Sequence, residues 1–386
     1  MRESGKPHYA FIDCVRGYAA LLVVLVHATY LFPNLPYPIH RLTVMGWHGV
    51  QLFFLASAVT LMTSWRHEMA QYGQVDVRAF FIRRFFRIAP AYYAASVLYF
   101  ALDPPAAGFK MWQAAAAFLF VNAWHPVLMP TVPGAWSVVP GGWSIGVEFT
   151  FYAAFPFIAG FITSRARATW LVLATVLLGA TLNFCLWPSL ATAFGATPAD
   201  NFLYFWFPNQ MSVFALGIWL FFVLKRDRGT QSVLTQHPNV MASVSVVMAL
   251  AVAYVRAPHW LTLQAVLPPA FLLVSLALML FIMALACARP GLFLNRAVAL
   301  MGRVSFSAYL LHFAILNVLS HLPWLQFYFN CTGWTAAVGL AFAMGGIVVI
   351  LLAASWCTYR AIEVPMIAVG KLLIRRRRLA LPQGIS

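Results

Sequence analysis

Acidic residues are scarce in this chain of 386 residues, which contains nine Asp and Glu against 25 Lys and Arg. Charged residues of both signs make up only 9% of the sequence, whereas a soluble domain has roughly a quarter. The chain is also 62% hydrophobic, too apolar for a soluble globule. The composition therefore predicts an all-α polytopic membrane protein with no sizeable soluble domain. Its net charge of +16 is expected in cytosolic loops, so it does not indicate a nucleic-acid partner.

Several chemical signatures are missing as well. The five cysteines are scattered without metal-ligand spacing, so no metal site is expected. There is no G-x-x-x-x-G-K-[ST] and no H-E-x-x-H, which excludes the usual P-loop and zincin motifs. We find no internal repeat, no low-complexity segment and no hydrolase-like domain after the last apolar run. Any chemistry must therefore come from polar residues within the membrane bundle.

Apolar runs separated by short basic loops predict ten membrane spans with both termini in the cytosol. No small-residue cleavage site follows the first run, so we expect it to be retained as a span. The last segment, 366–386, is predicted as a basic cytosolic tail whose Arg375–Arg378 run anchors topology or contacts anionic lipids. The expected spans are 17–33, 47–64, 89–102, 143–162, 169–187, 205–224, 240–255, 264–287, 304–322 and 334–356.

The segment 106–142 does not fit this alternation. Its apolar run Trp112–Trp124 is too short for an ordinary span, and a crossing there would place Arg165 and Arg167 outside the cell. Its proline and glycine content is typical of irregular backbone, which at membrane depth must be buried in protein or line a wet cavity. We therefore predict an outward-facing segment that contains a half-helix or re-entrant piece.

The first span holds the residues that best indicate function. Arg16 and His27 are 11 residues apart, so they share one helix face and are separated by a rise of about 16 Å. Asp13 precedes them at the start of the run. An ionisable side chain deep in a span is a candidate functional residue. From His27 alone, a neutral histidine bonded to a neighbouring helix is equally acceptable.

A basic cluster marks the start of the third span, where Arg83, Arg84 and Arg87 occur within five residues. Arg84 and Arg87 are three residues apart and share a helix face. Paired guanidinium groups suit phosphate, which they bind through parallel hydrogen bonds. Charge alone favours the simpler interpretation, that they anchor the span on the cytosolic side.

Glu148 is the only acidic residue between Asp103 and Asp200, and it follows Trp143 and Ser144 at the outer end of the fourth predicted span. Tyr152 lies one turn further on. A carboxylate at that depth needs a partner. His27 is a plausible one, because a carboxylate that orients an imidazole supports base-assisted acyl transfer. The alternative is that Glu148 only accepts hydrogen bonds from the irregular segment.

A second histidine inside the membrane is His312, which shares a helix face with Tyr309. For this residue alone, a packed and hydrogen-bonded core histidine is the more probable interpretation. Glu363, near the cytosolic end of the last span, is expected to close the bundle through an ion pair and not to take part in catalysis.

In this order the motifs resemble the acyltransferase-3 family of integral membrane O-acyltransferases. The resemblance covers most of the chain, although Gln51, Ala58 and Val364 depart from the family pattern. None of these departures affects the arginines, His27 or Glu148. The matching pieces are Phe11–Gly17 with the Arg-x10-His spacing to His27, Gly46–Ser57, Arg83–Pro90, Trp143–Glu148 with Phe151 and Tyr152, Gly302–His312 and Tyr359–Pro365.

The resemblance implies transfer of an acyl group, with acetyl favoured, from cytosolic acyl-CoA to a hydroxyl of an extracytoplasmic or lipid-linked glycan such as a surface polysaccharide or lipopolysaccharide. It implies a bacterial inner membrane location, membrane lipids and the glycan as partners, and association with glycan-assembly machinery. His27 would be the base or acyl carrier, Glu148 its orienter, Arg16 a residue of the same path, and Arg83, Arg84 and Arg87 the site for CoA phosphates. Trp143, Ser144, Tyr152, Tyr309, His312 and Asp13 are further site candidates.

Two other functions remain open from the sequence. In a proton-coupled transporter of a glycan or small anion, His27, His312 and Glu148 would relay protons. In a non-catalytic membrane partner of a glycan-assembly complex, these residues would be structural only. Paired inverted repeats would favour the transporter, and the sequence shows none.

Overall fold

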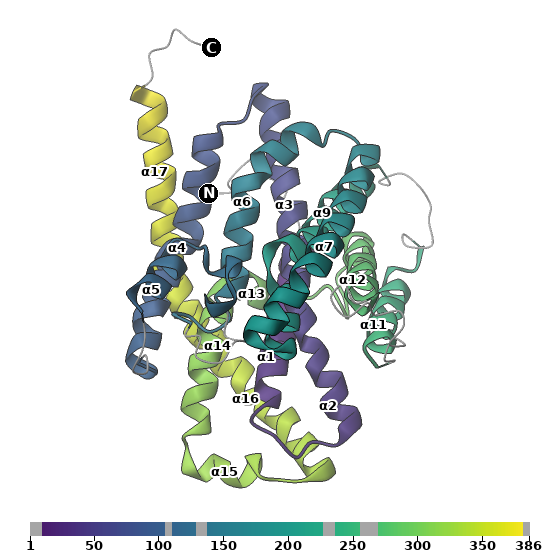
Figure 1. Cartoon of the computed structure of the whole chain (residues 1–386), viewed down its shortest axis with the longest axis vertical. Coiled ribbons are helices and arrows are strands. Elements are labelled where there is room, and N and C mark those ends of the chain that lie inside the picture. Colours follow the sequence, from purple (N-terminus) through teal and green to yellow (C-terminus); the bar gives the residue numbers. More distant parts are fainter. Residues whose placement is uncertain (1–9, 105–109, 129–136, 227–235, 255–268, 381–386) are drawn as a thin grey trace.

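The computed structural model describes residues 10–104, 110–128, 137–226, 236–254 and 269–380, and all regular structure within them is helical (Figure 1). This confirms the predicted all-α membrane bundle. The helices are α1 (Ala10–Thr29), α2 (Tyr37–Val44), α3 (Gly49–Tyr72), α4 (Val77–Leu102), α5 (Met111–Phe118), α6 (Trp143–Phe161), α7 (Arg165–Phe194), α8 (Ala196–Phe205), α9 (Phe207–Arg226), α11 (Pro238–Tyr254), α12 (Pro269–Cys287), α13 (Arg296–Arg303), α14 (Ser305–Ser320), α15 (Pro323–Phe329), α16 (Gly333–Thr358) and α17 (Val364–Ala380).

Each of the ten predicted spans overlaps a helix, but not every helix is long enough to cross a membrane. Within the described ranges, seven helical stretches are long and apolar enough to cross a membrane. The number is eight if the bent pair α13–α14 forms one span. The apolar parts of α11 and α12, Pro238–Val252 and Leu272–Cys287, are shorter, although part of the predicted 264–287 span lies outside the described residues. The structure thus establishes a polytopic bundle, and ten full spans stay a prediction.

Basic residues that the sequence assigns to the cytosol meet at one end of the bundle. Arg377 of α17 lies 3.8 Å from Asp76, the N-cap of α4. Arg66, near the end of α3, donates to the carbonyl oxygen of Ile162 at the end of α6 (2.6 Å). Figure 1 shows α17 at the upper end of the molecule, opposite α15. Contacts between sequence-distant basic segments therefore define one positively charged end.

Two helices extend beyond the predicted boundaries. α4 begins at Val77, well before the predicted start at residue 89, so Arg83, Arg84 and Arg87 lie within the helix. At the other end of the chain, α16 passes through a π-helical turn, Tyr359–Glu363, into α17. The predicted cytosolic tail is therefore helical from 366 to 380, and 381–386 lie outside the described residues.

The irregular segment before α6 contains short helical pieces only. These are α5 and the 3-10 turns Asn122–Trp124 and Pro126–Leu128, while 105–109 and 129–136 lie outside the described residues. The Tyr93 hydroxyl of α4 donates to the carbonyl oxygen of Phe118 (2.9 Å), and Phe120 stacks on Phe149 of α6 at 3.7 Å between ring centroids. Packing against two helices shelters this backbone, as irregular structure at membrane depth requires.

Close helix contacts position the start of α14 beside α1. A Cβ on Gly302 of α13 would lie 1.7 Å from the carbonyl oxygen of Asp13, and one on Gly17 would lie 2.1 Å from that of Val298. Only glycine allows this approach. α13 then meets α14 at a bend of 81°, which brings Ser305 next to α1 and α3. Elsewhere Ala58, a departure from the family pattern, lies against Gly217 of α9, whose missing side chain leaves the space.

The orientation of the irregular segment can be tested by cysteine labelling. In a background without the five native cysteines, we expect a cysteine replacing the exposed His125 to react with an impermeant thiol reagent added from outside. A cysteine replacing Arg167, in the first turn of α7, should react from the cytosolic side only. Labelling of position 125 from the cytosol alone would contradict the predicted topology.

Candidate active site

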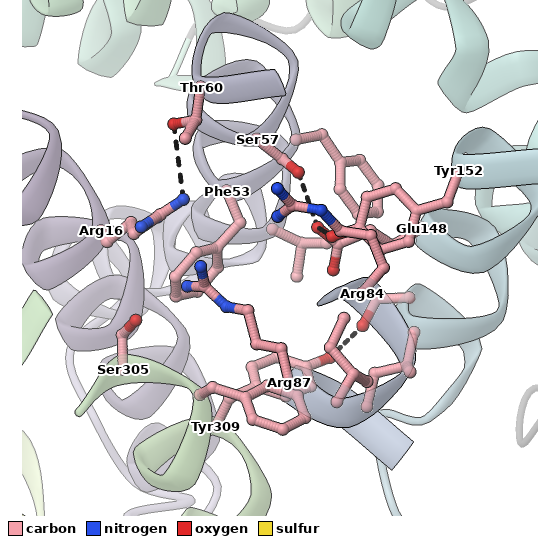
Figure 2. A pocket seen from close by; sticks show the side chains of 16 residues that line it. Arg16, Phe53, Ser57, Thr60, Arg84, Arg87, Glu148, Tyr152, Ser305 and Tyr309 are labelled. Carbon is pink, nitrogen blue, oxygen red and sulfur yellow. Dashed lines mark hydrogen bonds between the residues drawn. The ribbon is translucent and has the colours of Figure 1, made fainter. Parts of the chain in front are cut away.

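Five helices enclose a cavity inside the bundle. Its walls come from α1, α3, α4, α6 and α14, and it encloses about 720 Å³ of space, counting open solvent at its mouth. Figure 2 shows charged and hydroxyl side chains from these helices converging on the same space. Among the residues singled out from the sequence, the cavity is lined by Arg16, Arg84, Arg87, Ser144, Glu148, Tyr152 and Tyr309.

Three guanidinium groups point into the cavity: Arg16 from α1, and Arg84 and Arg87 from successive turns of α4 (Figure 2). Arg16 donates to the Thr60 hydroxyl at 3.4 Å. Among the described residues none of the three lies within ion-pairing distance of a carboxylate, and the buried Nε of Arg84 has no hydrogen-bond partner. Partly desolvated cations without counter-ions are costly, and this arrangement is chemically suited to a negatively charged ligand.

Arg83 points elsewhere, although it belongs to the same basic cluster. Its guanidinium pairs with Glu68 of α3 at 2.9 Å. The side chains of Arg83 and Arg84 diverge because adjacent residues on a helix point about 100° apart. The structure therefore separates the cavity-lining Arg84 and Arg87 from a neighbour that ties α3 to α4.

Glu148 is held by hydroxyl groups at the edge of the same cavity. Its carboxylate accepts hydrogen bonds from Ser57 of α3 at 2.7 Å and from Tyr152, one turn further along α6. Arg84 stacks beside this group, with its guanidinium carbon 5.8 Å from the centre of the Tyr152 ring. Glu148 thus places one negative charge among three positive ones without forming a close ion pair.

The expected pairing of Glu148 with His27 is not found. His27 does not line the cavity, and its ring contacts His312 instead. The two residues lie at different depths in the bundle. Because α6 begins only at Trp143, after the irregular segment, Glu148 lies beside Ser57 and at the same depth as Arg16. His27 lies about 16 Å further along α1 than Arg16.

Two histidines meet beyond the cavity, in what we call the histidine pair, His27 and His312. The Nε2 atom of His312 lies 3.3 Å from Nδ1 of His27, and the ring centroids are 5.0 Å apart. Phe313 packs against both rings, with centroid distances of 4.2 Å. His312 is fully buried, whereas His27 is half-buried.

Tyr309 separates the cavity from the histidine pair. It lines the cavity, and its ring centroid is 5.5 Å from that of His312, one turn along α14. Its hydroxyl donates to the carbonyl oxygen of Gly141 at 2.8 Å and lies 2.7 Å from the Ser144 hydroxyl. Gly141 has a positive φ of 77°, and a Cβ there would meet the Tyr309 hydroxyl at 2.9 Å. Tyr309 therefore contacts both the cavity and the histidine pair.

The start of α6 also carries a sequence pattern that needs structural context. Gly142–Gly146 reads G-W-S-I-G, which matches the G-x-S-x-G of hydrolase nucleophile elbows. That motif requires a strand before the serine, and the described residues have none. Ser144 is instead bonded to Gly141 and Tyr309, and no histidine contacts it. Its hydroxyl therefore fixes Tyr309 and does not resemble an activated nucleophile.

Two remaining candidates have packing roles. Asp13 lies 3.8 Å from Arg303 at the contact of α1 with α13, and Trp143 packs against Phe205 at 4.4 Å between ring centroids. Sequence reasoning missed Ser57, Thr60 and Ser305, which line the cavity. The available signal was a hydroxyl residue within an otherwise apolar helix. The described residues contain no group of three side chains able to hold a metal ion.

Comparison with known proteins identifies the family to which the chain belongs. No curated protein and no solved structure matches the chain. A family model described as an acyltransferase domain matches residues 9–356, nearly the whole chain, from the start of α1 to near the end of α16. The match includes every residue of the cavity and the histidine pair. The chain therefore belongs to the acyltransferase-3 family and is an integral membrane acyltransferase.

Proposed function

We propose that the protein transfers an acyl group, acetyl in the simplest case, from cytosolic acyl-CoA to a hydroxyl of an extracytoplasmic or lipid-linked glycan. The observation that carries the proposal is a set of three guanidinium groups that have no carboxylate partner among the described residues and are separated from the histidine pair by the ring of Tyr309. Family membership supports acyl transfer over the transporter considered from the sequence. The resemblance to the family implies the donor and the acceptor, and the positive charge of the cavity supports an anionic donor.

CoA phosphates fit the charge of the cavity. Arg84 and Arg87 lie on one face of α4, and Arg84 has a buried donor atom without a partner. Guanidinium groups bind phosphate through parallel charge-assisted hydrogen bonds. The first turns of α6 and α14 also line the cavity through Ser144 and Ser305, and helix N-termini favour anions. Arg16 supplies the third positive charge.

The acyl end of the donor would pass Tyr309 to reach the histidine pair. Two ring-to-ring steps of 5.5 and 5.0 Å connect Tyr309 with His312 and His312 with His27. A glycan hydroxyl is a weak nucleophile at neutral pH and needs a positioned base. In the proposed reaction its proton moves to His27, and its oxygen bonds to the thioester carbonyl carbon. The carbon–sulfur bond then breaks, and His27 returns the proton to the CoA sulfur.

Orientation follows from the charged end of the bundle. The positive-inside rule assigns the end with α17 and the α3–α4 turn to the cytosol, and with it both termini. Arg84 and Arg87 lie on the cytosolic half of α4, two to three turns from its start at Val77. His27, near the end of α1, would then face the outer half of a bacterial inner membrane, where a glycan and its assembly machinery would be partners.

The proposed donor site predicts a graded effect of arginine substitutions. We expect Arg84→Ala and Arg87→Ala to weaken binding of acetyl-CoA by about 1.5–3 kcal/mol each, the value of a charge-assisted hydrogen bond. Arg78→Ala is the matched control, because Arg78 is exposed on the same helix and does not line the cavity. Lysine at position 84 should restore binding only in part. Equal affinities in all of these variants, measured by titration in detergent, would show that the pair only anchors topology.

The proposed base predicts a loss of turnover without a loss of donor binding. His27→Ala should lower transfer of labelled acetyl from acetyl-CoA to glycan by about 10²–10⁴-fold, the usual contribution of a general base. Binding of acetyl-CoA should persist, since His27 does not line the cavity. His321→Ala, an exposed position near the end of α14, is the control. Near-normal transfer by His27→Ala in membranes with matched protein levels would remove the proposed base.

A further inference from the structure

Hydrogen bonds to two backbone carbonyl oxygens define which nitrogen of each histidine ring carries a hydrogen. Nδ1 of His27 lies 2.8 Å from the carbonyl oxygen of Val23, and Nδ1 of His312 lies 2.6 Å from that of Tyr309. A carbonyl oxygen only accepts hydrogen bonds, so both Nδ1 atoms must donate. In the neutral rings both Nε2 atoms are therefore bare acceptors.

This assignment defines which histidine donates and which accepts in the hydrogen bond between the two rings. The Nδ1–H of His27 faces both the Val23 carbonyl oxygen and Nε2 of His312, at 2.8 and 3.3 Å. His312 has no hydrogen on Nε2 to offer, so it accepts from His27 and cannot protonate it at Nδ1. The other nitrogen of His27, Nε2, is left as an unprotonated base. A proton from an acceptor hydroxyl can bind only there.

We propose that His312 is the positioning residue of the reaction, holding His27 with Nε2 free and accepting a hydrogen bond from the imidazolium that forms. This inference rests on the proposed function and gives His312 the role that the sequence suggested for Glu148. It accounts for a fully buried histidine whose one side-chain hydrogen-bonding partner, in the part of the chain that the structure describes, is another histidine.

Among the described residues, His312 is the only side chain placed to accept from Nδ1 of His27, and it shares this N–H with the backbone carbonyl oxygen of Val23. No carboxylate among the described residues bonds to either ring, and Glu148 is engaged by Ser57 and Tyr152. The other titratable groups with rings near the pair are Tyr30, 6.4 Å from the His27 ring, and Tyr309, 5.5 Å from the His312 ring. The Tyr309 hydroxyl is bonded to Gly141 and Ser144. When His27 gains a proton, the lone pair of His312 Nε2 is the acceptor that faces it in place of water.

Every proton and bond in the proposed step is accounted for. The acceptor O–H bond breaks, its proton binds Nε2 of His27, and the ester bond forms at the carbonyl carbon. The carbon–sulfur bond breaks, and the Nε2 proton passes to the leaving sulfur. Nδ1–H of His27 points at His312 throughout, and His312 neither gains nor loses a proton.

Two substitutions separate this role from simple packing. In His312→Gln the amide oxygen can stand where Nε2 stood and accept from His27, whereas the shorter side chain of His312→Asn reaches only the Nδ1 position. His321→Asn is the matched control, because His321 makes the same kind of ring contact with the carbonyl oxygen of Asn317 (2.8 Å) at an exposed site. Each variant is assayed as full-length protein in membranes with labelled acetyl-CoA, and kcat and KM are determined separately.

We expect His312→Asn to lower kcat by about 10- to 100-fold, as for loss of a hydrogen bond to a charged group, with KM for acetyl-CoA unchanged. The kcat of His312→Gln should be at least about tenfold higher than that of His312→Asn. Equal kcat in the Gln and Asn variants, or normal kcat in His312→Asn, overturns the inference. If His27→Ala is inactive in the same assay, the proposed base survives that result; if His27→Ala is active, the base and the role of His312 both fail. The proposed function itself fails if the unchanged protein transfers no label from acetyl-CoA to glycan.

Discussion

The close contact of α13 with α1 is the constraint on which the rest of the site depends. Gly302 and Gly17 let the two backbones approach without intervening side chains. The chain then bends by 81° into α14, and this bend sets the start of α14 beside Arg16 and its middle beside His27. Without that approach, Tyr309 would not close the cavity and His312 would not reach His27. A small-residue contact of this kind is a common basis of helix packing in membranes.

Three half-buried guanidinium groups line the cavity inside the membrane bundle, and among the described residues no ion pair offsets their partial desolvation. Glu148 supplies one negative charge, but it is engaged by hydroxyl groups, and Arg84 keeps a donor without a partner. Groups left unsatisfied in this way are preorganised for a ligand, because the ligand gains the hydrogen bonds without a reorganisation of the site. In the proposed reaction the polyanionic donor would bind at the arginines and the chemistry would take place at the histidine pair, with Tyr309 between them.

Sequence periodicity predicted part of the site and missed the rest for a physical reason. Arg16 and His27 on one face of α1, and Arg84 with Arg87 on one face of α4, follow from helix geometry within single elements. Pairing across helices depends on the depth at which each helix begins. Because the irregular segment precedes α6, Glu148 lies at the same depth in the bundle as Arg16. The bend before α14 places His312 at the depth of His27. Neither feature has a sequence signal strong enough to fix it, so the sequence paired Glu148 with His27, whereas the structure places Glu148 beside Ser57 and Tyr152 and brings His312 to His27.

The central claim is that one acyl-CoA molecule reaches from the cavity to the histidine pair, with its phosphates at the arginines and its thioester at the histidines. The most direct measurement is a cryo-electron microscopy structure with a non-hydrolysable acetyl-CoA analogue whose sulfur is replaced by methylene. The account predicts phosphate density within hydrogen-bond distance of Arg84 or Arg87, and the analogue's carbonyl next to His27, with room for an acceptor oxygen about 3–3.5 Å from the carbonyl carbon. An analogue bound outside the cavity, or one whose carbonyl remains on the cavity side of Tyr309, would contradict it.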